Sequence, residues 1–370
     1  MPANQLSGCT EFAVPEETIM SDDQIEAAAP ARARDDMGLE QLLESQRLER
    51  CPFPIPSSWF FVDFSENLAV GQVRNIQLFD QEWVLFRGES GKVGMSDPYC
   101  AHLGAHLGHG GTVCGDQLRC PFHHWEYNAD GFCVKVPYGK VAPAVIKKRP
   151  ILRTLPTRER YGQIWAWYHP YAEPPSWELP HIPCMEDEGW VGDQRGKWTA
   201  NTAVQEIVEN SVDIAHLKFL HGAAGIPPIN VEFDRHMQRF DIGGGYIVGE
   251  TWGAGAVGTV TFTQEGVSAT LFSYTQPITR ERTQMNMSFR HKDYPAGSRE
   301  LHIAKKLIDH MVHEAEGETS AGFESVDMVI WSNKKYRHKP LLCDGDGPIL
   351  LFRKWFRQFY VAEPEVMAKI

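Results

Sequence analysis

The sequence Cys100-Ala-His102-Leu-Gly, followed further along by Cys120-Pro-Phe-His123, decides how this chain is interpreted. Each stretch pairs one cysteine with one histidine, and seventeen residues separate the two pairs. Two thiolates and two imidazoles can hold a [2Fe–2S] cluster in which one iron is bound by cysteine and the other by histidine. Such a cluster has a higher reduction potential than an all-cysteine cluster. The motif therefore predicts a protein that transfers single electrons.

Structural zinc is the alternative to an iron–sulfur cluster, because two cysteines and two histidines also suit a tetrahedral zinc site. Zinc fingers favour Cys-x-x-Cys pairs, whereas each pair here mixes the two residue types. Gly104 follows the first pair closely, and a glycine lets backbone approach a buried inorganic centre. These features favour an iron–sulfur cluster over zinc.

Composition sets broad limits on the function. The chain has 370 residues, enough for two domains of ordinary size, and a net charge of −12, which gives no basic surface for nucleic acid. Beyond the two cysteines of the motif, six more of the eight are scattered without the spacing of a disulfide framework. We therefore expect a reducing, cytoplasmic location. No signal peptide and no apolar run long enough to cross a membrane is apparent, so no transmembrane segment is predicted.

The chain divides into three segments by composition. Residues 1–51 are polar and predict a mobile arm, with a short helix around Leu39–Leu48. Residues 52–170 show short strands and turns and contain the cysteine–histidine motif. A proline-rich stretch then marks a boundary, and residues 171–370 form a second domain.

The second domain is predicted to contain both helices and strands, each grouped apart. The pattern indicates a helix around 202–220, strands from about 229 to 291, and a long helical region from about 300 to 335. Strands grouped apart from helices indicate an α+β fold with an antiparallel sheet. The predicted architecture is an all-β cluster domain followed by a helix-grip-like domain, in which helices flank an antiparallel sheet.

A second metal site is predicted in the 202–220 helix. Glu209, Asp213 and His216 are spaced so that they share one face of a helix. His221 lies five residues after His216, so the helix must end or bulge between them for both to bind one metal. Gly222 directly after His221 is consistent with such an ending.

Asp327 is the predicted third ligand of this site. Two histidines and one carboxylate form a facial triad that leaves open positions on iron. Asp327 lies in a helical pattern between the apolar residues Val326 and Ile330, where a carboxylate is costly unless it is paired or bound to metal. The alternative is a structural aspartate bonded to a Lys or Arg.

A glycine-rich stretch resembles a nucleotide-binding motif but is not interpreted as one. Gly253-Ala-Gly-Ala-Val-Gly258 matches the GxGxxG pattern, which needs a helix after it. The residues that follow, Thr259-Val-Thr-Phe-Thr263, predict a strand. The chain is therefore expected to take electrons from a separate reductase or ferredoxin.

The two metal motifs together resemble a known family. Cys100-Ala-His102-Leu-Gly and Cys120-Pro-Phe-His123-His-Trp resemble the Rieske domain of non-haem iron oxygenases. The stretch 209–221 looks like the catalytic-iron motif of these enzymes, and 327–331 resembles their third-ligand segment in ketosteroid 9α-hydroxylase. Leu103 stands where ring-dihydroxylating members usually carry Arg. The motifs are thus most similar to those of ketosteroid 9α-hydroxylase, cholesterol 7-desaturase and aminopyrrolnitrin oxygenase.

The resemblance implies a set of cofactors and partners. Cys100, His102, Cys120 and His123 would hold a Rieske [2Fe–2S] cluster, and a mononuclear Fe(II) would be bound by the residues His216, His221 and Asp327. Electrons from NAD(P)H would arrive through a separate reductase. Family members form homotrimers in which an aspartate bridges the two iron centres of neighbouring subunits. In this chain Asp213 would link His216 to His123 of the partner subunit.

The resemblance also implies an activity. The protein would be a terminal oxygenase that uses O2 to hydroxylate, desaturate or oxidatively cyclise a bulky apolar substrate, steroid-like or polycyclic and aromatic. An aromatic-ring dioxygenase or an O- or N-demethylase of the same family is the alternative. A plain Rieske electron carrier or a redox sensor is more distant, because neither needs a second, open metal site.

Overall fold

Four antiparallel sheets carry most of the fold in the part of the chain that the structure describes. The computed structural model describes residues 50–316 and 327–361. The predicted arm therefore lies outside the described residues except for its last two positions, and the helix expected at Leu39–Leu48 lies outside them entirely. No helix among the described residues is long and apolar enough to cross a bilayer.

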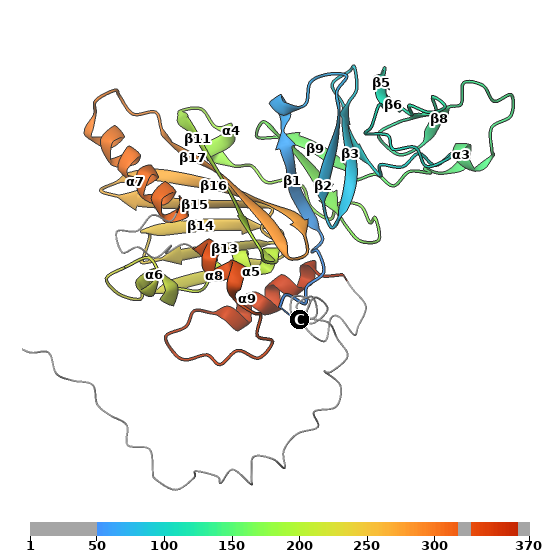
Figure 1. Ribbon diagram of the computed structural model, residues 1–370. Coiled ribbons are helices and arrows are strands. Elements are labelled where there is room, and N and C mark those ends of the chain that lie inside the picture. Colours follow the sequence, from blue (N-terminus) through green and yellow to red (C-terminus); the bar gives the residue numbers. More distant parts are fainter. Residues whose placement is uncertain (1–49, 317–326, 362–370) are drawn as a thin grey trace, which may run out of the picture. The chain divides into compact units, whose positions relative to one another are not determined.

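The first ten strands form three small sheets, with strand orders β1-β10-β9, β2-β3-β4 and β5-β6-β7-β8 (Figure 1). The elements of this region are β1 (Ser58–Phe64), η1 (Ser65–Asn67), β2 (Val73–Leu78), β3 (Gln81–Arg87), β4 (Val93–Ser96), β5 (Thr112–Cys114), β6 (Gln117–Arg119), β7 (Glu126–Tyr127), β8 (Cys133–Lys135), α3 (Val145–Lys148), β9 (Thr157–Arg160) and β10 (Gln163–Tyr168). This region contains both cysteine–histidine pairs.

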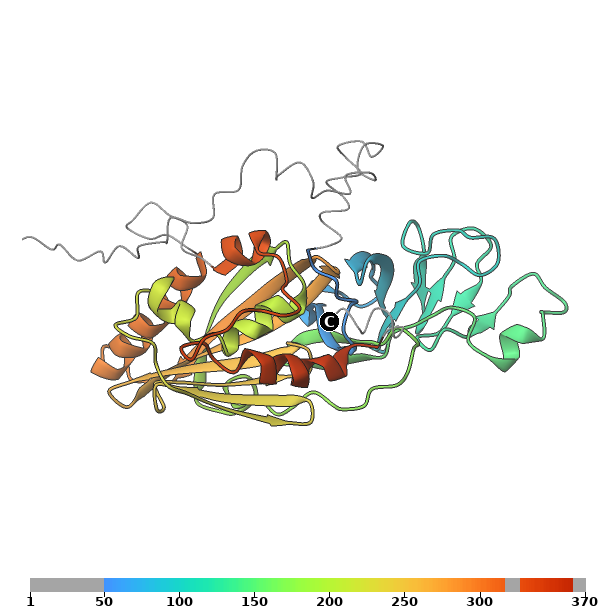
Figure 2. The same ribbon diagram turned by 90° about the horizontal axis from the view of Figure 1, so that it is seen from below.

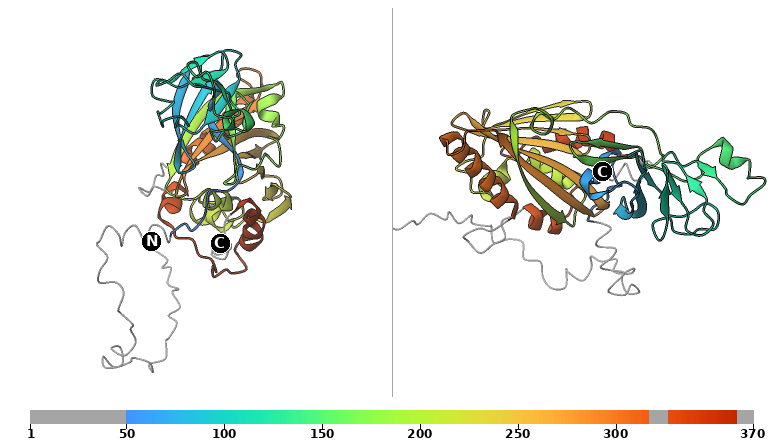
Figure 3. Two further views of the ribbon diagram at one scale, coloured as in Figure 1. Left: turned by 90° about the vertical axis from the view of Figure 1, so that its right-hand side faces the viewer. Right: turned by 90° about the horizontal axis from the view of Figure 1, so that it is seen from above.

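The later strands form one seven-stranded antiparallel sheet with the order β11-β17-β16-β15-β14-β13-β12. Figures 1 and 3 show it as a curved sheet, and its longest strands, β11, β17 and β16, lie together at one edge. Its strands are β11 (Trp190–Ala200), β12 (Ile229–Asp234), β13 (Met237–Ile242), β14 (Ile247–Trp252), β15 (Val257–Gln264), β16 (Val267–Thr279) and β17 (Arg282–Lys292). The stretch Gly253–Gly258 is the turn between β14 and β15 and the start of β15, so no helix follows it.

Helices accompany this sheet, and Figure 2 shows several of them on one of its sides. They are α4 (Pro183–Glu186), α5 (Val204–Val208), η2 (Glu209–Ser211), α6 (Ala215–Phe219), α7 (Arg299–Glu316), α8 (Asp327–Asn333), α9 (Ile349–Phe356) and η3 (Arg357–Phe359). The predicted α+β class with an antiparallel sheet and flanking helices is confirmed. The expected single helix at 202–220 is wrong, because that segment breaks into α5, η2 and α6.

The hairpin between β2 and β3 shows how the small sheets contact the large one. Phe79 and Asp80 form its two-residue turn with φ values of 59° and 62°, as a type I′ hairpin requires. A left-handed conformation is unusual for phenylalanine. The turn is held because both amides donate hydrogen bonds to carbonyls of β16, at 3.0 and 3.1 Å.

An aromatic core joins β1 and β10 to the large sheet. Trp59 and Trp165 are fully buried together with Val257 and Phe272. A hydrogen bond reinforces this packing. The backbone amide of Ala254, in the turn between β14 and β15, donates to the Ser58 hydroxyl at 3.2 Å. The proline-rich stretch after residue 169 therefore separates two regions in sequence that share a core in space.

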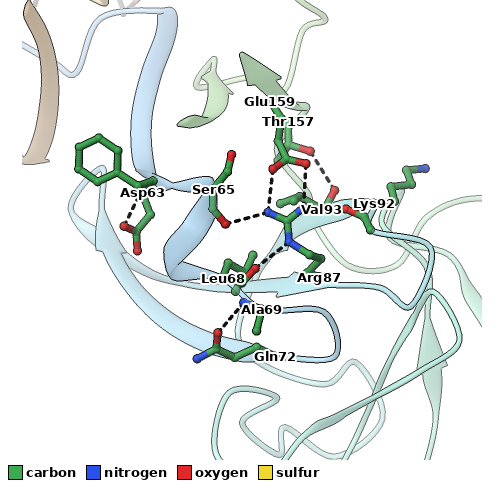
Figure 4. A network of polar contacts seen from close by, with 12 residues as sticks. Asp63, Ser65, Leu68, Ala69, Gln72, Arg87, Lys92, Val93, Thr157 and Glu159 are labelled. Atoms are coloured by element: carbon green, nitrogen blue, oxygen red, sulfur yellow. Dashed lines mark hydrogen bonds and ion pairs between the residues drawn. The ribbon is translucent and has the colours of Figure 1, made fainter. Parts of the chain in front are cut away.

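Arg87 ties together the loops beside β3 (Figure 4). Its guanidinium donates to both carboxylate oxygens of Glu159, at 2.7 and 2.8 Å, and to the carbonyls of Leu68, Gly91 and Ser65. The Arg87 side chain is only 11% exposed. Hydrogen bonds from Arg87 lower the pKa of Glu159 below its ordinary value. The ionised carboxylate therefore stabilises the folded state.

We expect Glu159→Gln to destabilise the protein at neutral pH and to have less effect as the pH falls. A lowered pKa contributes stability above the unfolded value near 4.5, and that stability is lost as the pH falls through the folded pKa. Urea denaturation of both proteins from pH 7 down to pH 3 measures the difference. Glu188→Gln, at an exposed position, is the control. If the difference in free energy of unfolding between wild type and the Glu159 variant stays constant from pH 7 to pH 3, this role of Glu159 is contradicted.

Candidate functional site

The two cysteine–histidine pairs lie on loops with the same backbone path. In each loop the cysteine carbonyl accepts a hydrogen bond from the amide four residues later, from Gly104 to Cys100 at 2.9 Å and from His124 to Cys120 at 3.1 Å. Both of these later residues are left-handed, with φ values of 73° and 58°. Glycine adopts this conformation freely, whereas His124 does so at a cost that the loop must compensate. The two loops therefore present their ligands as a pseudo-symmetric pair.

The four side chains converge in a way that fits an iron–sulfur cluster. The Cys100 and Cys120 thiols are buried, and the rings of His102 and His123 lie with centroids 4.7 Å apart. His102 Nδ1 is buried and has no hydrogen-bond partner among the described residues. A buried nitrogen that is left unpaired is costly unless it binds a metal. The donor set therefore suits a cluster with thiolates inside and imidazoles toward the surface.

Two aromatic residues support this centre, and the sequence did not single them out. The Tyr127 hydroxyl lies 3.0 Å from Cys100 Sγ, and burial raises the pKa of Tyr127, so the hydroxyl stays protonated and can donate to a thiolate. Trp125 stacks on His102 with ring centroids 4.7 Å apart and donates its indole N–H to the Tyr138 hydroxyl at 3.0 Å. The sequence shows that Trp125 and Tyr127 follow Cys120 closely, but it does not show that their side chains point toward the cysteine and histidine ligands.

The predicted second site is also brought together. His216, His221 and Asp327 each offer a ligand atom, and these atoms all lie within 4.8 Å of one another. His221 Nε2 is 3.5 Å from Asp327 Oδ2. The helix α6 ends before His221, and Gly222 has a φ of 73°, as the spacing required. Among the described residues Asp327 forms no ion pair with a Lys or Arg. Two imidazoles and a carboxylate on separate elements suit a facial iron triad.

His216 is oriented by its other ring nitrogen. Its Nδ1 contacts the backbone carbonyl of Asp213, so that Nε2 is the ring nitrogen that can serve as a metal ligand. The Asp213 carboxylate lies 3.9 Å from the same Nδ1 and is 44% exposed. Asp213 therefore lies beside the site and also reaches the surface.

Asn210 also belongs to this site, although its residue type and its position on a continuous helix gave no sign of a role there. Its side-chain amide donates to Asp327 Oδ2 at 3.1 Å and lies 3.3 Å from His216 Nε2. A hydrogen bond to a ligating carboxylate fixes its orientation. The only signal in the sequence was its place in the stretch Glu209–His216. On one continuous helix Asn210 would have pointed away from His216.

Glu209 has a different role from the predicted one. It was expected on the same face as His216, but it forms a two-pronged ion pair with Arg353 on α9, at 2.7 and 2.8 Å. Both side chains are nearly buried, with exposures of 7% and 12%. The break of the helix at η2 turns Glu209 toward α9 and away from the candidate metal ligands.

A cavity of about 660 Å³ opens on the three candidate ligands. It lies between the sheet face of β13–β17 and the helices α5 to α8, and Asn210, His216, His221 and Asp327 form part of its wall. Its apolar lining includes Phe240, Ile247, Val260, Phe262, Leu271, Met285, Met287, Met311, Met328 and Trp331. A volume within the usual range of about 300–1,000 Å³ for ligand pockets suits a large organic molecule.

Comparison with known protein families agrees with this geometry. Residues 58–151 match the Rieske [2Fe-2S] domain, and residues 166–360 match the 3-ketosteroid 9alpha-hydroxylase C-terminal domain. The chain belongs to the Rieske oxygenases. It is therefore an oxidoreductase with a Rieske [2Fe–2S] cluster. The predictions of the family, the enzyme class and the cluster are confirmed.

Individual relatives give the same family, and solved structures give the same fold. The chain is 32% identical to a cholesterol 7-desaturase of Caenorhabditis elegans, over 90% of this chain and 83% of the relative. It is 29% identical to a probable 3-ketosteroid-9-alpha-monooxygenase, oxygenase component, of Rhodococcus rhodochrous. This match covers 82% of this chain and 79% of the relative. In fold the chain is similar to dicamba monooxygenase, with a TM-score of 0.58, 17% identity and coverage of 82% and 96%. It is also similar in fold to NdmA of Pseudomonas putida CBB5. The TM-score is 0.60 and the identity 19%, and the match covers 85% of this chain and 91% of that one.

We expect Asp327→Ala to lose the mononuclear iron and to keep the Rieske cluster. The change removes the only carboxylate of the group, whereas the cluster ligands lie on separate loops. Iron analysis with EPR of the reduced protein checks this, and iron sufficient for the cluster alone is the expected result. Asp309→Ala, at an exposed position on α7, should retain all the iron. Full iron content in the Asp327 variant would exclude Asp327 as a ligand.

Proposed function

We propose that this Rieske oxygenase uses O2 to hydroxylate, desaturate or cyclise a bulky, apolar, fused-ring substrate of the sterol class. The observation that carries the proposal is the cavity, whose apolar wall is interrupted by His216, His221 and Asp327. The relatives named for cholesterol and for 3-ketosteroids support the same substrate class. An electron carrier would leave both the cavity and this group of ligands without a use.

Each residue of the site has a defined task in this proposal. His216, His221 and Asp327 hold an Fe(II), which when bound supplies the chemistry of O2 activation. Asn210 orients Asp327, and the Asp213 carbonyl keeps His216 in the tautomer whose Nε2 can ligate. The apolar side chains of the cavity bind the ring system and exclude water from the reacting carbon.

We further propose the domain division and partners expected from the sequence. Residues 52–170 serve electron transfer and 171–370 serve catalysis, with electrons from a separate reductase or ferredoxin. Relatives that are named oxygenase components support such a partner. Buried free thiols at Cys51, Cys133 and Cys184 support a reducing, cytoplasmic location.

A homotrimer is the proposed assembly, with Asp213 bridging the metal centres of neighbouring subunits. Leu103, Phe122 and Tyr138, close to the imidazole ligands, are each about 60% exposed. Large apolar side chains gathered on a surface favour contact with another protein surface. The exposed Asp213 carboxylate beside His216 supports a bridge to His123 of the partner subunit.

The substrate class is tested by anaerobic binding followed by reaction. The iron-loaded, reduced protein is incubated separately with sterols, ketosteroids, polycyclic aromatic pigments and indoles, and O2 is then added. We expect a sterol or ketosteroid to bind and to return with an added oxygen atom or with two hydrogen atoms fewer. Conversion of the aromatic compounds alone, or loss of a methyl group, would favour the dioxygenase or demethylase alternative.

We expect Asp213→Ala to retain both metal centres and to lose turnover by at least about 10- to 100-fold, the usual effect of removing a side chain that orients a metal ligand or links to it. Iron content, the EPR signal of the cluster and steady-state turnover with the reductase measure the separation. Asp234→Ala, an exposed substitution at the end of β12, should behave as wild type. Full activity of the Asp213 variant would refute the bridging role.

A further inference from the structure

Across the large sheet, one row of side chains is polar and the next row is apolar, and each row contains one glycine. The polar row comprises, on β13 to β16, the paired residues Gln238, Thr251, Gly258 and Ser273. The next row comprises Phe240, Gly249, Val260 and Leu271. Directly paired residues of an antiparallel sheet face the same side, and the last three members of the polar row line the cavity. The largely apolar sheet wall of the cavity therefore contains a polar strip.

Gln238 lies behind this strip and is fully buried. The Ser211 hydroxyl donates to the Val208 carbonyl at 2.7 Å, so its oxygen is left to accept from Gln238 Nε2 at 2.8 Å. This arrangement assigns the amide orientation and leaves Gln238 Oε1 without a hydrogen-bond partner among the described residues. A buried acceptor without a donor is uncommon in proteins.

Gly258 leaves a slot between the two hydroxyls of the strip. Its φ is not left-handed, so the backbone does not require glycine. A Cβ at this position would lie 2.6 Å from Ser273 Oγ. Glycine inside a strand is unfavourable and often marks a place where another group approaches closely. The missing side chain makes room beside Thr251 and Ser273 for an atom from the cavity.

The polar strip begins next to the metal ligands. Ser211, which positions Gln238, directly follows Asn210, and Asn210 donates to Asp327. In the part of the chain that the structure describes, the hydroxyls of Thr251 and Ser273 form no hydrogen bond to the protein. They are therefore available to a ligand that also lies beside the candidate iron site.

We propose that Thr251 and Ser273, with Gln238 behind them, form a subsite for the hydroxyl group of the fused-ring substrate. This assignment rests on the proposed function. Hydroxyl side chains donate and accept, but the free atom behind them, Gln238 Oε1, only accepts. A ligand alcohol that donates to the Thr251 oxygen turns the Thr251 hydroxyl hydrogen toward Gln238, and a ketone does not. The subsite thus selects an alcohol and fixes which ring carbon faces the iron ligands.

The test compares three ligands with one carbon skeleton: cholesterol, its ketone and the hydrocarbon without oxygen. Equilibrium dialysis of radiolabelled ligand with iron-loaded, anaerobic, full-length protein gives each dissociation constant. Wild type should bind the alcohol at least about tenfold more tightly than the other two, the value of one well-placed hydrogen bond. Thr251→Val should abolish this ratio, and Thr251→Ser should restore it. Gly258→Ala, which keeps both hydroxyls and fills the slot, should also abolish it.

The ratio of the dissociation constants distinguishes loss of the subsite from misfolding, because a misfolded variant binds all three ligands more weakly and leaves their ratio unchanged. Thr259→Val, on the opposite face of β15, is the matched control and should keep the wild-type ratio. If wild type binds the alcohol and the hydrocarbon equally, or if Thr251→Val keeps the ratio, the subsite is wrong while the proposed function stands. If wild type binds none of the three, the sterol class itself is wrong and the subsite fails with it.

Discussion

The ion pair between Glu209 and Arg353 is the constraint on which the catalytic site depends. It joins η2 to α9 with two short hydrogen bonds, and the Arg353 guanidinium also lies over the Tyr336 ring at 4.5 Å. Both charges are nearly buried, so removing either one leaves the other unpaired, at a cost of about 3–5 kcal/mol. Because the pair is made at the first residue of η2, it determines where the next two residues point.

The geometry of η2 explains how three consecutive residues serve three purposes. A 3₁₀-helix has about three residues per turn, so neighbouring side chains point roughly 120° apart. Glu209 faces α9, Asn210 faces Asp327, and Ser211 faces Gln238 on the sheet. A continuous α-helix would place His216 and Glu209 on one face instead. The break is accommodated by Gly347, where a Cβ would lie 1.7 Å from the Val212 carbonyl oxygen.

Electron transfer and catalysis use different solutions to the same problem of holding metal ligands. The cluster ligands lie on two rigid loops whose left-handed turns repeat one backbone path. The candidate iron ligands come from α6, the loop after it and the start of α8, and they are aligned by contacts to Asn210 and to a backbone carbonyl. The aromatic core around Trp59 and Trp165 joins the region of the cluster to the sheet that forms the cavity.

Residue type and short spacing were enough to predict the candidate metal ligands, because metal ligation depends on both. The sequence predicted Cys100 and its three partner ligands, the second group of ligands, and the strand-rich α+β class. The tertiary structure alone decided the parts that depend on a break or on strand register. Asn210 joins the site only because the helix stops at η2, and the row containing Thr251 forms only because four strands pair in one register. Such contacts join residues far apart in sequence, and no local pattern encodes them.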